Sequence, residues 1–109
     1  MYAAGDGVPE EPSEAARWYR IAAERGHWTA QRVLAAKYLA GTGVPKNEVE
    51  GLAWLNVAAT SGREATLREQ KRVAGLLPIA VVKQAEQRGK ELAAEVTRNR
   101  KGRPSPPDR

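Results

Sequence analysis

Apolar residues recur along this chain at intervals of three and four, and glycines interrupt the pattern at regular places. This spacing is typical of amphipathic helices, which have one apolar and one polar face. Gly26, Gly41 and Gly62 each follow the last apolar position of a helix, where glycine readily adopts the left-handed conformation that ends it. The pattern predicts helices, and no strands, over residues 12–25, 28–40, 47–61, 64–76 and 78–98.

The first 62 residues repeat at a spacing of 36. The segment YAAGDGVP at 2–9 returns as YLAGTGVP at 38–45, and residues 2–26 and 38–62 are identical at 11 of 25 positions. The matched positions carry glycines, a proline, aromatic residues and alanines, which form turns and cores. Such a repeat indicates stacked units that bury their apolar faces on one another. We therefore predict an all-α solenoid of helix-turn-helix units.

The repeat breaks down in the last part of the chain. Gln70 stands where Leu34 would recur, and no third glycine-rich turn follows. The long helix predicted after Leu77-Pro78 has one apolar and one polar face, as a terminal capping helix requires. We divide the chain into repeats at 1–62, a divergent closing helix pair at 63–98 and a disordered basic tail at 99–109.

Composition and charge narrow the choice of function. The chain has no cysteine, which excludes disulfides, thiolate metal sites and thiol catalysis. No apolar run approaches the ~18 residues that a membrane span needs. The net charge of +5 comes from the C-terminal part, whose basic residues are able to contact nucleic acid or an anionic surface. Nucleic acid is the less favoured partner, because no aromatic residue is interleaved with these basic residues.

No group of residues suggests catalysis, a cofactor or a metal ion. His27 is the only histidine, so a metal site would need carboxylates alone around it. The Gly-x-Gly turns lack the Gly-Lys-Ser/Thr and the preceding strand of a phosphate-binding loop, and they recur at the repeat period. We therefore expect a protein that is not an enzyme and that holds no cofactor.

The motifs of the repeat resemble the Sel-1-like repeat family, whose members are α/α solenoids related in shape to tetratricopeptide repeats. The resemblance rests on Gly-x-Gly-Val-Pro, on EAARWY at 14–19, on Ala-Ala-x-x-Gly at 22–26 and on Ala-x-x-x-Leu-Ala-x-x-Tyr at 30–38. It implies an adaptor in protein–protein interaction whose motif residues are structural, with 63–98 as the divergent pair that closes bacterial arrays. Gly51 departs from the usual Ala, at a cost of about 1 kcal/mol unless a neighbouring helix needs the close approach.

The tryptophans occupy two kinds of position. Trp18 and Trp54 share a repeat position, and we expect both to pack in the core between the two helices of their unit. Trp28 has Glu64 as its repeat partner, which indicates an exposed position, and exposed tryptophan is enriched at binding hot spots. On the concave surface made by successive first helices, the candidate partner-binding residues are Arg17, Arg20 and Trp28.

The favoured function is therefore a scaffold or adaptor that binds another protein. One alternative is a capping segment of a larger repeat array, without a partner of its own. Another is binding of nucleic acid or an anionic surface by the basic end, which deletion of residues 98–109 would abolish.

The start of the sequence adds two expectations. Tyr2-Ala3-Ala4 matches the end of a repeat helix whose earlier part does not precede it in this sequence. We therefore expect a longer natural protein, or self-association through the truncated N-terminal edge. The compartment stays open: cytoplasmic as the chain stands, and periplasmic or exported if a leader precedes Met1.

Overall fold

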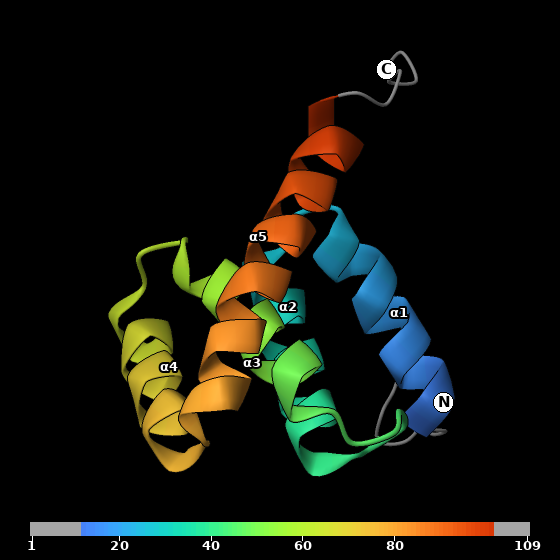
Figure 1. Cartoon of the computed structure of the whole chain (residues 1–109). Helices are drawn as coiled ribbons and strands as arrows, with labels where there is room; N and C mark the ends of the chain where they lie inside the picture. Colours follow the sequence, from blue (N-terminus) through green and yellow to red (C-terminus); the bar gives the residue numbers. More distant parts are fainter. Residues whose placement is uncertain (1–11, 102–109) are drawn as a thin grey trace.

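The computed structural model describes residues 12–101, which form five α-helices and, within that range, no strand (Figure 1). This confirms the predicted all-α class. The last helix continues to Lys101, three residues beyond its predicted end near residue 98. The predicted turn at 5–9 and most of the predicted tail lie outside the described residues. The helices are α1 (Pro12–Glu24), α2 (Trp28–Ala40), α3 (Glu48–Ala59), α4 (Glu64–Leu76) and α5 (Ile79–Lys101).

The loop between α2 and α3 is fixed by hydrogen bonds at both of its ends. Gly41 ends α2 in the left-handed conformation, with φ of 77°, and its N–H donates to the carbonyl oxygen of Lys37. The side-chain oxygen of Asn47 accepts from the N–H of Glu50 at 3.0 Å, which caps the start of α3. The Glu50 carboxylate bonds to Arg88, and the Asn47 N–H donates to the Tyr38 carbonyl oxygen, so no reciprocal capping box is formed.

Helix α3 is the centre of the fold. It packs against α2, α4 and α5, and eight of its twelve residues are buried. Trp54 is fully buried, as the repeat pattern predicted. Because α3 is apolar on almost every side, it needs neighbours on almost every side, and the other helices are arranged to supply them.

Two glycines bring neighbouring helices close to α3. A Cβ on Gly51 would lie 2.7 Å from the Leu39 Cγ and 3.2 Å from the Ala35 carbonyl oxygen, both on α2. On the other side, a Cβ added to Gly89 of α5 would lie 3.4 Å from the Ala53 carbonyl oxygen of α3. The glycine at position 51 is therefore explained by the close approach of α2, which the sequence left open.

Helix α5 packs along α3 and not on α4 (Figure 1). Its C-terminal part reaches α1, where the Asn99 side-chain amide donates to the Glu24 carbonyl oxygen at 3.0 Å. From the corner at Leu77 and Pro78, α4 and α5 diverge (Figure 1). Only Thr66 and Val73 are buried on α4, which packs mainly against α3 and is also joined to α2 by the ion pair of Glu69 with Arg32 at 3.5 Å.

The prediction that Trp18 lies in the core is wrong. Its side chain is 57% exposed, whereas Trp54 at the equivalent position is 0% exposed. The difference lies in the neighbouring helices and not in the residue: α3 packs against α2, α4 and α5, whereas α1 packs mainly against α2.

Substitution of two of the helical glycines, Gly75 and Gly51, by alanine is expected to change stability in opposite directions. Gly75→Ala on α4 adds a Cβ into open space and is expected to raise the free energy of unfolding by about 0.5 kcal/mol through helix propensity. Gly51→Ala gains the same propensity but forces α2 outward, and is expected to lower it by about 1–2 kcal/mol. Urea unfolding followed by circular dichroism measures both values, and a stabilised Gly51→Ala protein would contradict the close approach.

Candidate binding surfaces

The structure does not bring the three predicted partner-binding residues into one surface. Arg17 extends from α1 with its side chain 71% exposed and pairs, among the described residues, with Glu14 at 3.4 Å. Arg20 is partly buried and is held by the contacts described below. Trp28, at the start of α2, is half-buried and not exposed as predicted. Of the three, Arg17 alone is available to a partner without losing a close internal contact.

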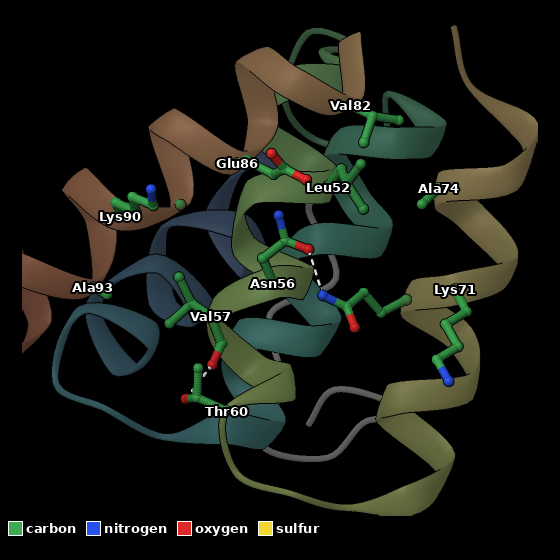
Figure 2. Close-up of a pocket in the computed structure, with 12 residues that line it drawn as sticks. Leu52, Asn56, Val57, Thr60, Lys71, Ala74, Val82, Glu86, Lys90 and Ala93 are labelled. Atoms are coloured by element: carbon green, nitrogen blue, oxygen red, sulfur yellow. Dashed lines mark hydrogen bonds between the residues drawn. The ribbon is translucent and has the colours of Figure 1, made fainter. Parts of the chain in front are cut away.

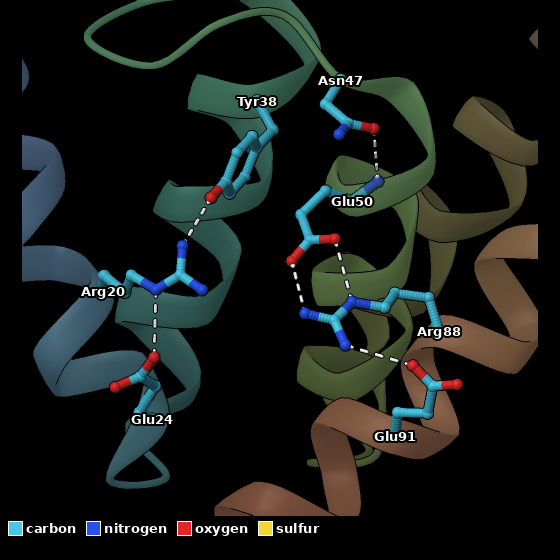
Figure 3. A network of polar contacts seen from close by, with 7 residues as sticks. All are labelled: Arg20, Glu24, Tyr38, Asn47, Glu50, Arg88 and Glu91. Carbon is cyan, nitrogen blue, oxygen red and sulfur yellow. Dashed lines mark hydrogen bonds and ion pairs between the residues drawn. The ribbon is translucent and has the colours of Figure 1, made fainter.

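Arg20 connects α1 to α2. Its Nε donates to the Glu24 carboxylate at 3.0 Å, and its Nη1 donates to the Tyr38 hydroxyl at 2.7 Å (Figure 3). Burial opposes the charge on Arg20, but the hydrogen bonds with Glu24 and Tyr38 outweigh it and raise the pKa of the guanidinium. These contacts give Arg20 a structural role in joining the two helices of the first unit.

Trp28 is covered on one face by an arginine. The Arg63 guanidinium lies 4.0 Å from the centre of the Trp28 ring, a cation–π contact between the start of α2 and the residue before α4. Trp28 also lines a hollow of about 310 Å³ between the start of α2, the end of α3 and the C-terminal half of α5. The side chain therefore forms one wall of a depression in the surface.

A larger hollow of about 400 Å³ lies where α4 and α5 diverge (Figure 2). Helix α3 forms its floor with Leu52, Asn56 and Val57, and the other two helices form its walls. The two hollows share the lining residues Val57, Thr60 and Ala93. They are therefore neighbours along α5, and together we call them the α5 groove.

The residue that breaks the repeat lies in this groove. Gln70 donates from its side-chain amide to the Asn56 side-chain oxygen at 2.7 Å, linking α4 to α3 (Figure 2). The equivalent Leu34 in the first unit is 1% exposed. Gln70 thus holds α4 by a polar contact and remains half-buried, where a leucine would seek full burial.

A charged clamp fixes α5 on α3. Arg88 donates from Nε and Nη2 to the two oxygens of Glu50, at 3.0 and 3.1 Å, and from Nη1 to Glu91 at 3.1 Å (Figure 3). The hydrogen bond to Glu50 is the main cause of the raised pKa of Arg88. This paired geometry is the strong form of an arginine–carboxylate contact, and the Glu50 side chain is only 15% exposed.

An apolar patch on α1 is exposed to solvent. Trp18 and Ile21 are 57% and 42% exposed, and lie one turn apart. Their repeat equivalents in α3, Trp54 and Val57, are 0% and 6% exposed. We call Trp18 and Ile21 the α1 edge.

The described residues contain no group of three or more His, Cys, Asp and Glu side chains that could hold a metal ion. His27 precedes α2 and makes no capping hydrogen bond through its side chain. No helix within residues 12–101 is both long enough and apolar enough to cross a membrane.

Pairs of antiparallel helices that recur at a fixed period define this chain as an α/α helical-repeat protein. The sequence profile of the Sel1 repeat family matches residues 1–27 and 28–62, and the chain belongs to that family.

The fold is also that of a crystal structure of a protective antigen from uropathogenic Escherichia coli strains, which displays an SLR fold. The two share 28% sequence identity with a TM-score of 0.73 over 94% of this chain. This chain spans 23% of the length of that antigen. Among curated proteins, none matches the chain.

Reasoning from the sequence found the turns and helices but missed the α5 groove. The groove depends on the direction that α5 takes, which no local pattern specifies. One signal was present, because Gln70 in place of a core leucine indicates that α4 is not covered in the way that α2 is.

Two double-mutant cycles are expected to give a larger coupling free energy for the clamp than for an exposed ion pair. A cycle of Glu50→Gln with Arg88→Met is expected to give a coupling free energy of about 1–2 kcal/mol, because the pair is doubly bonded and largely shielded. The control cycle of Glu14→Gln with Arg17→Met, on an exposed pair, is expected to give less than about 0.5 kcal/mol. Urea unfolding measures the free energy of unfolding of each variant. Equal coupling free energies would show that the clamp stabilises the protein no more than an exposed ion pair does.

Proposed function

We propose that this chain is a non-catalytic scaffold that binds another protein, and that the α1 edge is its main contact. Sel1 repeats generally mediate protein–protein interaction, which supports the class of function but names no partner. The observation that carries the proposal is that Trp18 and Ile21 are exposed at positions that are buried in the next repeat.

The exposed edge provides a source of binding energy. Full burial of a large apolar side chain contributes about 1.5–3 kcal/mol, and tryptophan is enriched among residues that dominate interfaces. In the second unit, the equivalent residues Trp54 and Val57 are buried, and α3 packs against α2, α4 and α5. A partner that covers Trp18 and Ile21 with apolar side chains would therefore suit the α1 edge.

The location of α5 restricts where a partner binds. The surface made by successive first helices was the predicted contact, but α5 lies on α3 and reaches α1 only near Glu24. That surface is thus covered at α3, and its open part is the α1 edge. Arg17, next to Trp18, is exposed enough to exchange Glu14 for a carboxylate of the partner.

A second role, as the closing segment of a repeat array, is supported by α5. Its apolar residues Ala85, Leu92 and Val96 are buried, and the clamp fixes it on α3. Most of its outward side chains are polar, as a terminal helix in water requires, and the exposed Ile79 at its first residue is an exception. This role is compatible with partner binding at the α1 edge, since the two involve different faces.

Removal of the α1 edge is expected to abolish partner binding without unfolding the protein. The double variant Trp18→Ala/Ile21→Ala changes exposed residues, so its stability is expected to stay within about 1 kcal/mol of the original. A partner isolated from the source cells on the immobilised chain, and then purified, is expected to bind this variant at least tenfold more weakly in calorimetry.

The matched control is Leu76→Ala/Ile79→Ala, which removes two apolar side chains that are 72% and 70% exposed at the corner between α4 and α5. This variant is expected to bind the partner as the original chain does. Equal loss in both variants would indicate nonspecific apolar adhesion. Unchanged binding after removal of the α1 edge would refute it as the contact.

A further inference from the structure

We propose that the α5 groove binds an amphipathic helix of a partner protein that carries acidic residues beside its apolar face. The inference rests on the proposed function as a protein-binding scaffold. It does not depend on the α1 edge, because the groove is lined by α2, α3, α4 and α5 and contains no residue of α1.

The length of the groove suits a helix. Its lining residues on α5 extend from Val82 to Thr97. At 1.5 Å per residue, these fifteen steps span about 22 Å, which is the length of a partner helix of four turns. The shared residues Val57, Thr60 and Ala93 join the two hollows, so one helix is able to occupy both.

The lining of the groove is suited to large apolar side chains. Small residues on its walls, Ala74 and Ala93, leave room above the apolar floor at Leu52 and Val57. Recognition of a helix by a groove takes this form, with apolar anchors three and four residues apart entering the depression. Leucine or isoleucine of the partner would fill the space that Gln70 and these small residues leave open.

The charges at the groove specify an acidic partner. Lys71 on α4 and Lys90 on α5 line the opposite walls, and neither forms an ion pair with another described residue. Arg63 adds a third positive charge at the Trp28 end. Glu86 is the only acidic side chain in the lining, at the end near Val82 (Figure 2).

This distribution of charge also predicts how the partner helix lies. Its acidic residues are expected over Lys71, Lys90 and Arg63, and a neutral or basic residue is expected over Glu86. The chain's own residues 102–109 are a poor occupant, because they contain three prolines and two arginines against one aspartate. Proline-rich basic sequence neither forms a helix nor complements a basic rim.

The test uses two synthetic 16-residue helical peptides with the same stripe of leucines, one flanked by glutamates and the other by lysines. Binding to the full chain is followed by NMR chemical shifts and by calorimetry. The acidic peptide is expected to shift Trp28, Thr60 and Ala93, to bind at least tenfold more tightly than the basic one, and to weaken as salt is raised.

Charge-reversed variants locate the contact. The double variant Lys71→Glu/Lys90→Glu is expected to bind the acidic peptide about tenfold more weakly, or weaker still. Lys83→Glu, a matched change of an exposed lysine of α5 outside the groove lining, is expected to alter affinity less than twofold. Ala93→Leu fills the groove without changing its charge and is expected to lower the affinity for the peptide as well. Circular dichroism checks that each variant is folded.

Several outcomes would overturn the inference. These are equal affinity for both peptides, an effect of Lys83→Glu as large as that of the groove variants, or shifts confined to the α1 edge. Concentration-dependent dimerisation lost in Lys71→Glu/Lys90→Glu would make a second copy the occupant instead. Trp18→Ala/Ile21→Ala separates the two proposals, because it is expected to keep full affinity for the acidic peptide even though it loses the partner of the α1 edge.

Discussion

The rest of the structure depends on the burial of α3 between α2 and α5. Almost every side of α3 is apolar, and Trp54 at its centre is inaccessible to solvent. A glycine lies at each of these contacts. Gly51 of α3 faces α2, and Gly89 of α5 faces the backbone of α3 at Ala53. A Cβ at position 51 would lie 2.7 Å from Leu39 Cγ and 3.2 Å from the Ala35 carbonyl oxygen, so α2 or its Leu39 side chain would have to move, whereas a Cβ at position 89 would just touch α3. The positions of α2 and α5 are therefore set by α3, and the surfaces that remain open follow from them.

The clamp between Arg88 and Glu50 explains why α5 packs on α3 and leaves α4 partly uncovered. Glu50 stands in the first turn of α3, where it could have completed a capping box, and it bonds to Arg88 instead. Placing α5 along α3 closes the surface made by successive first helices and opens the groove beside α4. Both candidate binding surfaces are thus departures from strict repetition. At one, no described helix covers Trp18 and Ile21 of α1, and at the other, α5 does not cover α4.

Much of the fold could be predicted from the sequence, because helix spacing and glycine turns are local signals. The boundaries of α2 and α4 were predicted to the residue, and the repeat period identified α3 as a counterpart of α1. Burial was not predicted as well, because Trp18 and Trp54 are the same residue at the same repeat position with different neighbours. The groove was missed for a related reason. The groove exists because of the direction that α5 takes. Gln70, in place of a core leucine, indicated only that α4 is not buried as α2 is.

The two surfaces differ in the physical origin of the binding that they offer. The α1 edge presents aromatic and aliphatic area with Arg17 beside it, so its affinity would come mainly from the removal of apolar surface from water and depend little on salt. The α5 groove combines an apolar floor with lysines that lack ion-pair partners among the described residues, so charge would decide which helix enters it. If both proposed surfaces bind, the clamp and the Asn99 contact would keep α5 in place between them, so that one partner need not displace the other.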